Sequence, residues 1–157
     1  MMIDAQHLFS DNQTVNATAL STNVIDLSLD RAIGAGEPMA VVFVIDSNAD
    51  QGTGDEDYTF AVEYATNAAI STGRQEVGRL IFESGTPTAP ALDADLLVAG
   101  FQFAIPLPPS GTDMTARYIG VRYTLAGTSP TVNVTAFLQP LSMVDSRAYY
   151  ASGYSLT

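Results

Sequence analysis

The sequence predicts an all-β protein, because apolar and polar residues alternate along most of its 157 residues. Such alternation is typical of strands that bury one face and expose the other. Clusters of Gly, Pro, Asn, Asp and Ser separate the alternating segments, as turns between strands require. No segment keeps a helical period of apolar residues over three turns. We therefore expect antiparallel strands packed as a β-sandwich or a barrel.

Seven segments are expected to be strands. Residues 58–65 place four large apolar or aromatic side chains on one face, and Tyr58 and Tyr64 lie at its two ends. Residues 39–46 are apolar on both faces, which predicts a central strand that is covered on both sides. A short helical turn is expected within residues 89–98. The expected strands are residues 24–29, 39–46, 58–65, 77–83, 99–105, 117–127 and 131–139, and the turns are residues 34–38, 47–57, 84–90, 106–113 and 126–130.

The composition limits the function classes. Seventeen acidic residues face six arginines and no lysine, giving a net charge of -11. This charge disfavours nucleic acid and anionic membranes as partners. Only 15% of the residues are charged, against about 25% in an average domain, so a neutral surface suited to protein contact is expected. The chain has no cysteine, no apolar segment long enough to span a membrane and no signal-peptide pattern, so we expect no disulfide, no membrane span and no export by the usual route.

The length predicts one domain, which we divide into an N-terminal arm (residues 1–20) and a β-sandwich with a C-terminal tail (residues 21–157). The arm is apolar at several positions but has no evident core of its own. The tail is rich in Tyr beside an Arg, the residue types that anchor interfaces, although it could equally be a last strand of the sandwich. The predicted interface residues are Ile3, His7, Leu8, Phe9, Arg147, Tyr149, Tyr150 and Tyr154.

Nothing in the sequence favours catalysis, and we expect neither an enzyme nor a cofactor. His7 is the only histidine, and a Ser-His-Asp triad or a zinc site needs partners that this chain does not offer near it. The acidic loop between Asp46 and Asp57 is the best candidate for a calcium ion, but its spacing does not match an EF-hand. We interpret it as a solvated loop and expect no metal. Carboxylate pairs such as Asp93 and Asp95 lack a tryptophan platform for sugars.

The two ends of the chain resemble a known family. "MIDAQHLFSDNQTV" (residues 2–15), "ATALSTNVIDL" (17–27), "GEPM" (36–39) and "DSRAYYASGY" (145–154) are similar to the capsid cement, or decoration, proteins of tailed bacteriophages, the Bordetella-phage type. The resemblance implies a jelly-roll sandwich on the outer surface of the icosahedral head, assembled in the host cytoplasm. It also implies that the protein bridges neighbouring major capsid proteins as a homo-oligomer, for which we favour a dimer over a trimer.

The resemblance suggests that the apolar residues of the N-terminal arm are buried against a neighbouring subunit. Deleting residues 2–15 would then leave the sandwich folded and abolish assembly. The alternative function is a ligand-binding β-sandwich of a phage tail, with carbohydrate or a receptor as its ligand. That alternative needs exposed aromatic side chains along one face, and the sequence offers Tyr58, Tyr64, Tyr118 and Tyr123.

Overall fold

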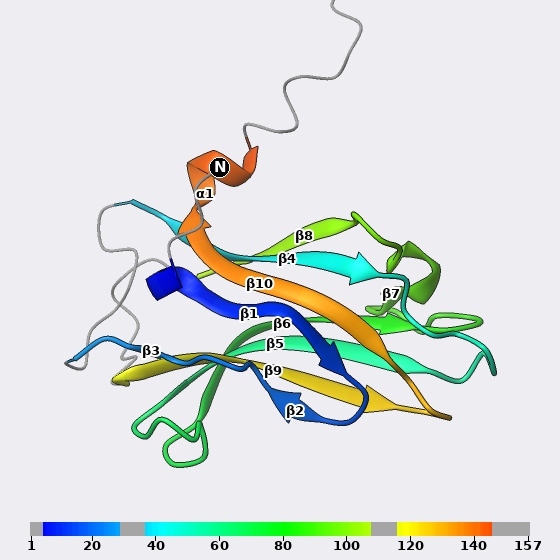
Figure 1. Cartoon of the computed structure of the whole chain (residues 1–157), viewed down its shortest axis with the longest axis horizontal. Helices are drawn as coiled ribbons and strands as arrows, with labels where there is room; N and C mark the ends of the chain where they lie inside the picture. The colour runs from blue at the N-terminus through cyan, green and yellow to red at the C-terminus, as the bar shows by residue number, and fades with distance from the viewer. Residues whose placement is uncertain (1–4, 29–36, 108–115, 146–157) are drawn as a thin grey trace, which may run out of the picture.

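The computed structural model describes residues 5–28, 37–107 and 116–145, which form two packed β-sheets (Figure 1). The short helices of this described part are η1 (Ala5–His7), η2 (Ala94–Leu96) and α1 (Leu141–Asp145). None of them is long and apolar enough to cross a membrane. The strands are β1 (Leu8–Val15), β2 (Ala19–Leu20), β3 (Ile25–Asp26), β4 (Met39–Ser47), β5 (Asp57–Ala65), β6 (Gln75–Glu83), β7 (Leu92–Asp93), β8 (Gln102–Pro106), β9 (Tyr118–Ala126) and β10 (Val132–Pro140).

The strand pairing is that of a jelly roll. The first sheet has the order β1-β10-β4-β8, and the second has the order β2-β9-β5-β6-β7 with β3 beside β9. Early strands pair antiparallel with late ones: β1 with β10, β2 and β3 with β9, β4 with β8, and β5 with β6. The chain thus resembles one long antiparallel ribbon whose successive strand pairs alternate between the two sheets. The predicted fold class, an antiparallel jelly-roll β-sandwich, is confirmed.

The core lies between the two sheets and follows the predicted faces. Tyr58, Phe60, Val62 and Tyr64 of β5 are each at most 1% exposed and belong to one apolar cluster. The alternating residues of β9 and β10 join them from their own strands. β4 runs inside the first sheet between β10 and β8, and both of its faces are largely buried. This burial agrees with the apolar residues that both faces of residues 39–46 carry.

The N-terminal segment differs from the expected arm. β1 is an edge strand of the first sheet, and Phe9 is fully buried in the shared core. β1 could not be predicted as a strand from the sequence, because its register with β10 shifts twice. The shifts lie between Leu8 and Ser10 and between Ser10 and Gln13. Asn12, inside the second shift, has a φ of 44°. Each shift breaks the two-residue alternation from which a strand is predicted.

Smaller differences concern lengths. The strand expected over residues 24–29 is the two-residue β3, while β6 begins two residues earlier than expected. The helical turn expected within residues 89–98 is η2, whose first turn is capped by the Asp93 carboxylate. The short α1 follows β10 directly and was not anticipated. A single turn of helix leaves no periodic signal long enough to detect.

Candidate protein interface

The structure separates the predicted interface residues into three groups. His7 is exposed at the end of η1, and Leu8 is half-buried opposite Phe137 of β10. Phe9 is fully buried in the core of its own chain, so it is not available to a partner and its assignment to an interface is corrected. The remaining predicted residues lie outside the described part of the chain: Ile3, Arg147, Tyr149, Tyr150 and Tyr154.

The acidic loop between β4 and β5 uses carboxylates to hold its own backbone. The Glu56 carboxylate accepts hydrogen bonds from the backbone N–H groups of Thr53 (2.9 Å) and Gly54 (2.9 Å). The Asp55 carboxylate accepts hydrogen bonds from the backbone N–H (3.1 Å) and the hydroxyl (3.0 Å) of Thr128. The hydroxyl of Thr53 contributes most to lowering the pKa of both Asp55 and Glu56. Across residues 5–28, 37–107 and 116–145, no three His, Asp or Glu side chains group closely enough to hold a metal ion.

The aromatic set needed by a carbohydrate- or receptor-binding module is not on the surface. Tyr58, Tyr64 and Tyr123 are at most 1% exposed. Tyr118 is half-buried, and the Arg117 guanidinium lies 5.1 Å from the centre of its ring. These four side chains therefore do not form an exposed platform for a sugar or a receptor.

Each arginine that the structure describes pairs with a carboxylate of the same chain. Arg74 and Arg122 both contact Glu63, at 3.6 and 2.8 Å, and Arg79 lies 3.6 Å from Glu76. The guanidinium of Arg117 donates two hydrogen bonds to the Asp26 carboxylate, at 2.7 and 2.6 Å. These four guanidinium groups therefore all have carboxylate partners within the fold.

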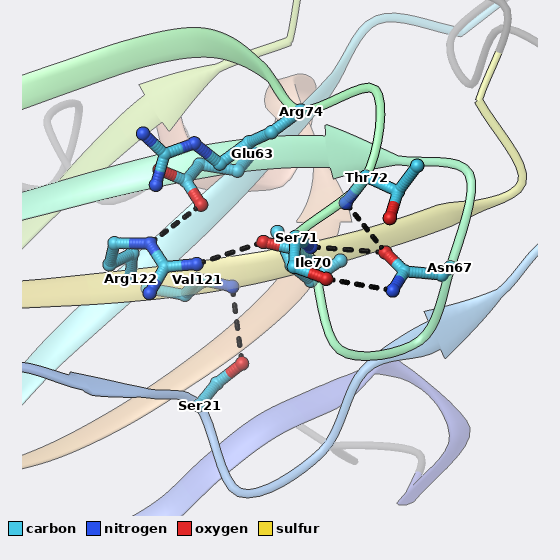
Figure 2. A network of polar contacts seen from close by, with 9 residues as sticks. All are labelled: Ser21, Glu63, Asn67, Ile70, Ser71, Thr72, Arg74, Val121 and Arg122. Atoms are coloured by element: carbon cyan, nitrogen blue, oxygen red, sulfur yellow. Dashed lines mark hydrogen bonds and ion pairs between the residues drawn. The ribbon is translucent and has the colours of Figure 1, made fainter.

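A second arginine contact fixes the loop between β5 and β6 (Figure 2). The Arg122 guanidinium donates to the Glu63 carboxylate and also to the backbone carbonyl of Ile70 (3.0 Å). Ile70 is fully buried with a φ of 47°, a rare conformation for a β-branched residue. A Cβ on Gly120 would lie only 3.0 Å from the Ile70 side chain. Asn67 closes the loop by accepting the N–H groups of Ser71 and Thr72. The strained residue is thus held by contacts on several sides.

Three exposed apolar side chains lie close together in the sequence around η2. We call the side chains of Leu92, Leu96 and Val98 the η2 patch; they are 40%, 43% and 47% exposed. No alternating or helical pattern in the sequence indicates this patch. The sequence shows three consecutive apolar residues from Leu96 to Val98, but such a short run does not tell which of them are exposed. Three of the four exposed large apolar residues in the described part belong to it, the fourth being Met143.

Comparison with known proteins identifies the family. The family model of Bbp16 matches residues 9–138. The chain belongs to the Bbp16 family. The match fits a family of Bordetella-phage proteins and indicates a virion structural protein. No curated protein matches the chain.

The part that matches the Bbp16 family coincides with the sandwich. The match begins at the second residue of β1 and ends within β10, the two strands that pair at one edge of the first sheet. The family resemblance therefore includes β1. This agrees with β1 being a strand of the domain and not an appended arm.

Proposed function

We propose that this Bbp16-family protein is a capsid cement protein, which binds the outer surface of the phage head and bridges neighbouring copies of the major capsid protein. The observation that carries the proposal is the Bbp16 match over residues 9–138. The similarity of the chain ends to phage decoration proteins supports the finer assignment. The role is structural and not catalytic, and it requires no cofactor.

The charge supports a location outside the shell. A net charge of -11 opposes contact with packed DNA, whose phosphates are also negative. On the outer surface the same charge is tolerated, because it faces solvent and counterions. We therefore place the protein on the outer surface of the virion, added to heads in the host cytoplasm.

The proposed mechanism is additive. DNA packed inside a head pushes the shell outward and strains the seams between capsid subunits. A folded sandwich that contacts both sides of a seam resists its opening with the free energy of its own interface. Many copies act together, so a modest affinity at each site stabilises the whole shell.

Heads prepared without this protein would test the proposal. Purified protein is added to DNA-filled heads and to empty heads, and co-sedimentation and electron microscopy then detect binding. We expect regularly spaced copies on the outer surface and a higher temperature of DNA release. A protein that stays in the supernatant, or that binds only to tails, would contradict a cement function.

The oligomeric state stays a prediction, with a dimer favoured over a trimer. An N-terminal arm without a core of its own does not support a dimer, because Phe9 is buried within its own chain. Light scattering on the purified protein measures the mass directly. If the protein is a monomer in solution and pairs only on heads, the contact between copies depends on binding to the shell.

A further inference from the structure

We propose that the η2 patch is the surface that docks on the capsid shell, against a protein surface that carries apolar side chains flanked by Lys or Arg. This inference rests on the proposed function and names the part of the sandwich that performs it. Isolated exposed apolar side chains are common and need no explanation. Three such side chains lie within seven residues, and only one other large apolar side chain is exposed in the described part, so these residues are the strongest candidates for an apolar contact with a partner.

The η2 patch is held rigidly by its buried neighbours. Ala94 and Leu97 are fully buried and anchor η2 to the core. The Leu97 carbonyl accepts the backbone N–H of Ala49 (2.9 Å), and the Ala94 carbonyl accepts the side-chain amide of Gln51 (2.7 Å). Beyond the patch, the Asn48 side-chain carbonyl accepts the N–H of Ala99 (2.8 Å). A surface fixed in this way loses little conformational entropy when a partner binds.

The charges around the patch favour a cationic partner. Asp93 and Asp95 are exposed and alternate with the apolar residues of the patch in the sequence. Across the described residues, each arginine already pairs with a carboxylate of its own chain, and the sequence contains no lysine. A symmetric contact between two copies of this chain through the patch would bring Asp93 and Asp95 of each copy against those of the other. A shell surface with Lys or Arg beside an apolar area complements both features of the patch.

Two variants and two matched controls test the inference. Leu96→Ser combined with Val98→Ser removes the apolar contact, and Asp95→Lys reverses a charge beside it. Met143→Ser is the control for an exposed apolar residue, since Met143 is 57% exposed on α1. Asp11→Lys is the control for the charge change, because Asp11 is an exposed acidic residue on β1. Thermal unfolding followed by circular dichroism verifies that all four proteins remain folded.

Binding to heads prepared without the protein is then measured by co-sedimentation over a series of salt concentrations. We expect the two patch variants to bind about tenfold more weakly or worse, as truncation at the centre of an interface does. The two controls should bind within about twofold of the wild type, as residues outside an interface do. Binding of the wild type should weaken as salt rises, and Asp95→Lys should show a smaller salt dependence.

The outcomes separate this inference from the proposed function. If the wild type binds heads and the patch variants bind equally well, the cement function stands and the η2 patch is not its docking surface. If the wild type does not bind heads, both proposals fall. If the patch variants instead change the molecular mass measured by light scattering, the patch joins copies of this chain, and docking on the shell through it is overturned.

Discussion

The hydroxyl groups of Ser10 and Tyr123 lie 2.7 Å apart in the interior of the sandwich, and both residues are fully buried. Ser10 belongs to β1 of the first sheet and Tyr123 to β9 of the second. Ser10 donates its own proton to the Gln13 side-chain carbonyl (2.7 Å), so the Tyr123 hydroxyl donates to Ser10. The Gln13 amide in turn donates to the Leu20 carbonyl of β2 (3.0 Å). This chain of hydrogen bonds ties the N-terminal strand to the opposite sheet.

Removing only the Ser10 hydroxyl should cost more than removing both hydroxyls, because Tyr123 is then left without a partner. Ser10→Ala leaves the buried Tyr123 hydroxyl without its acceptor, which should lower the free energy of unfolding by about 1–3 kcal/mol. Tyr123→Phe leaves Ser10 its bond to Gln13 and should cost about 1 kcal/mol. Urea denaturation of both single variants and the double variant measures the coupling. A double variant whose cost equals the sum of the single costs would indicate that the two hydroxyls act independently.

Deleting residues 2–15 should destabilise the sandwich, contrary to the expectation for a free arm. The deletion removes β1 and exposes the edge of β10, and it takes Phe9 from the core. Loss of a buried Phe side chain alone costs about 3–5 kcal/mol. Deleting residues 2–7 is the matched control, because it leaves β1 in place. Thermal unfolding should show a large decrease in melting temperature for the longer deletion only; equal melting temperatures would contradict the role of β1.

The two arginines beside Glu63 should differ in their contribution to stability. Glu63 has a buried side chain, Arg122 is 22% exposed at 2.8 Å, and Arg74 is 52% exposed at 3.6 Å. Arg122→Ala leaves the buried Glu63 carboxylate with only the longer contact to Arg74 and frees the Ile70 carbonyl, so we expect a loss of about 3 kcal/mol. Arg74→Ala should cost less than about 1 kcal/mol, as expected for an exposed pair. Chemical denaturation of both variants compares them, and similar losses would contradict the distinction.

Acid should weaken the link between β3 and the segment before β9. Hydrogen bonds from the Arg117 guanidinium and the Ser28 backbone N–H lower the pKa of Asp26 from 3.8 to about 2. Because the pKa is lower in the folded state, the carboxylate stabilises the fold above the unfolded pKa. This contribution is lost as the pH falls through about 2.

Melting temperatures of the wild type and Asp26→Asn, measured from pH 6 to pH 2, test this assignment. The wild type should melt higher at pH 6, and the difference should shrink below the unfolded pKa of 3.8 and vanish near 2. A difference that does not change with pH would show that the ionisation of the Asp26 carboxylate does not contribute to the stability. Asp11→Asn, at an exposed position of β1, is the control.

Local alternation was sufficient to predict most of the strands and their buried faces. It placed Tyr58, Phe60, Val62 and Tyr64 on one face, which the structure buries in the core, because a strand turns every second side chain to the same side whatever it pairs with. It failed for β1, where two register shifts place both Phe9 and Ser10 inside. The acidic composition and the absence of cysteine were likewise properties of the sequence alone.

Only the tertiary structure decided which strands pair and which side chains remain exposed. Ser10 meets Tyr123 across 113 positions of the chain, and Arg117 meets Asp26 across 91. No local pattern encodes contacts over such separations, because they depend on how the whole ribbon wraps. The exposure of the η2 patch has the same origin, since it follows from the burial of Ala94 and Leu97 beside it. The sequence by itself therefore determined the strands and the charge, and the packing of the two sheets determined the surface that a partner meets.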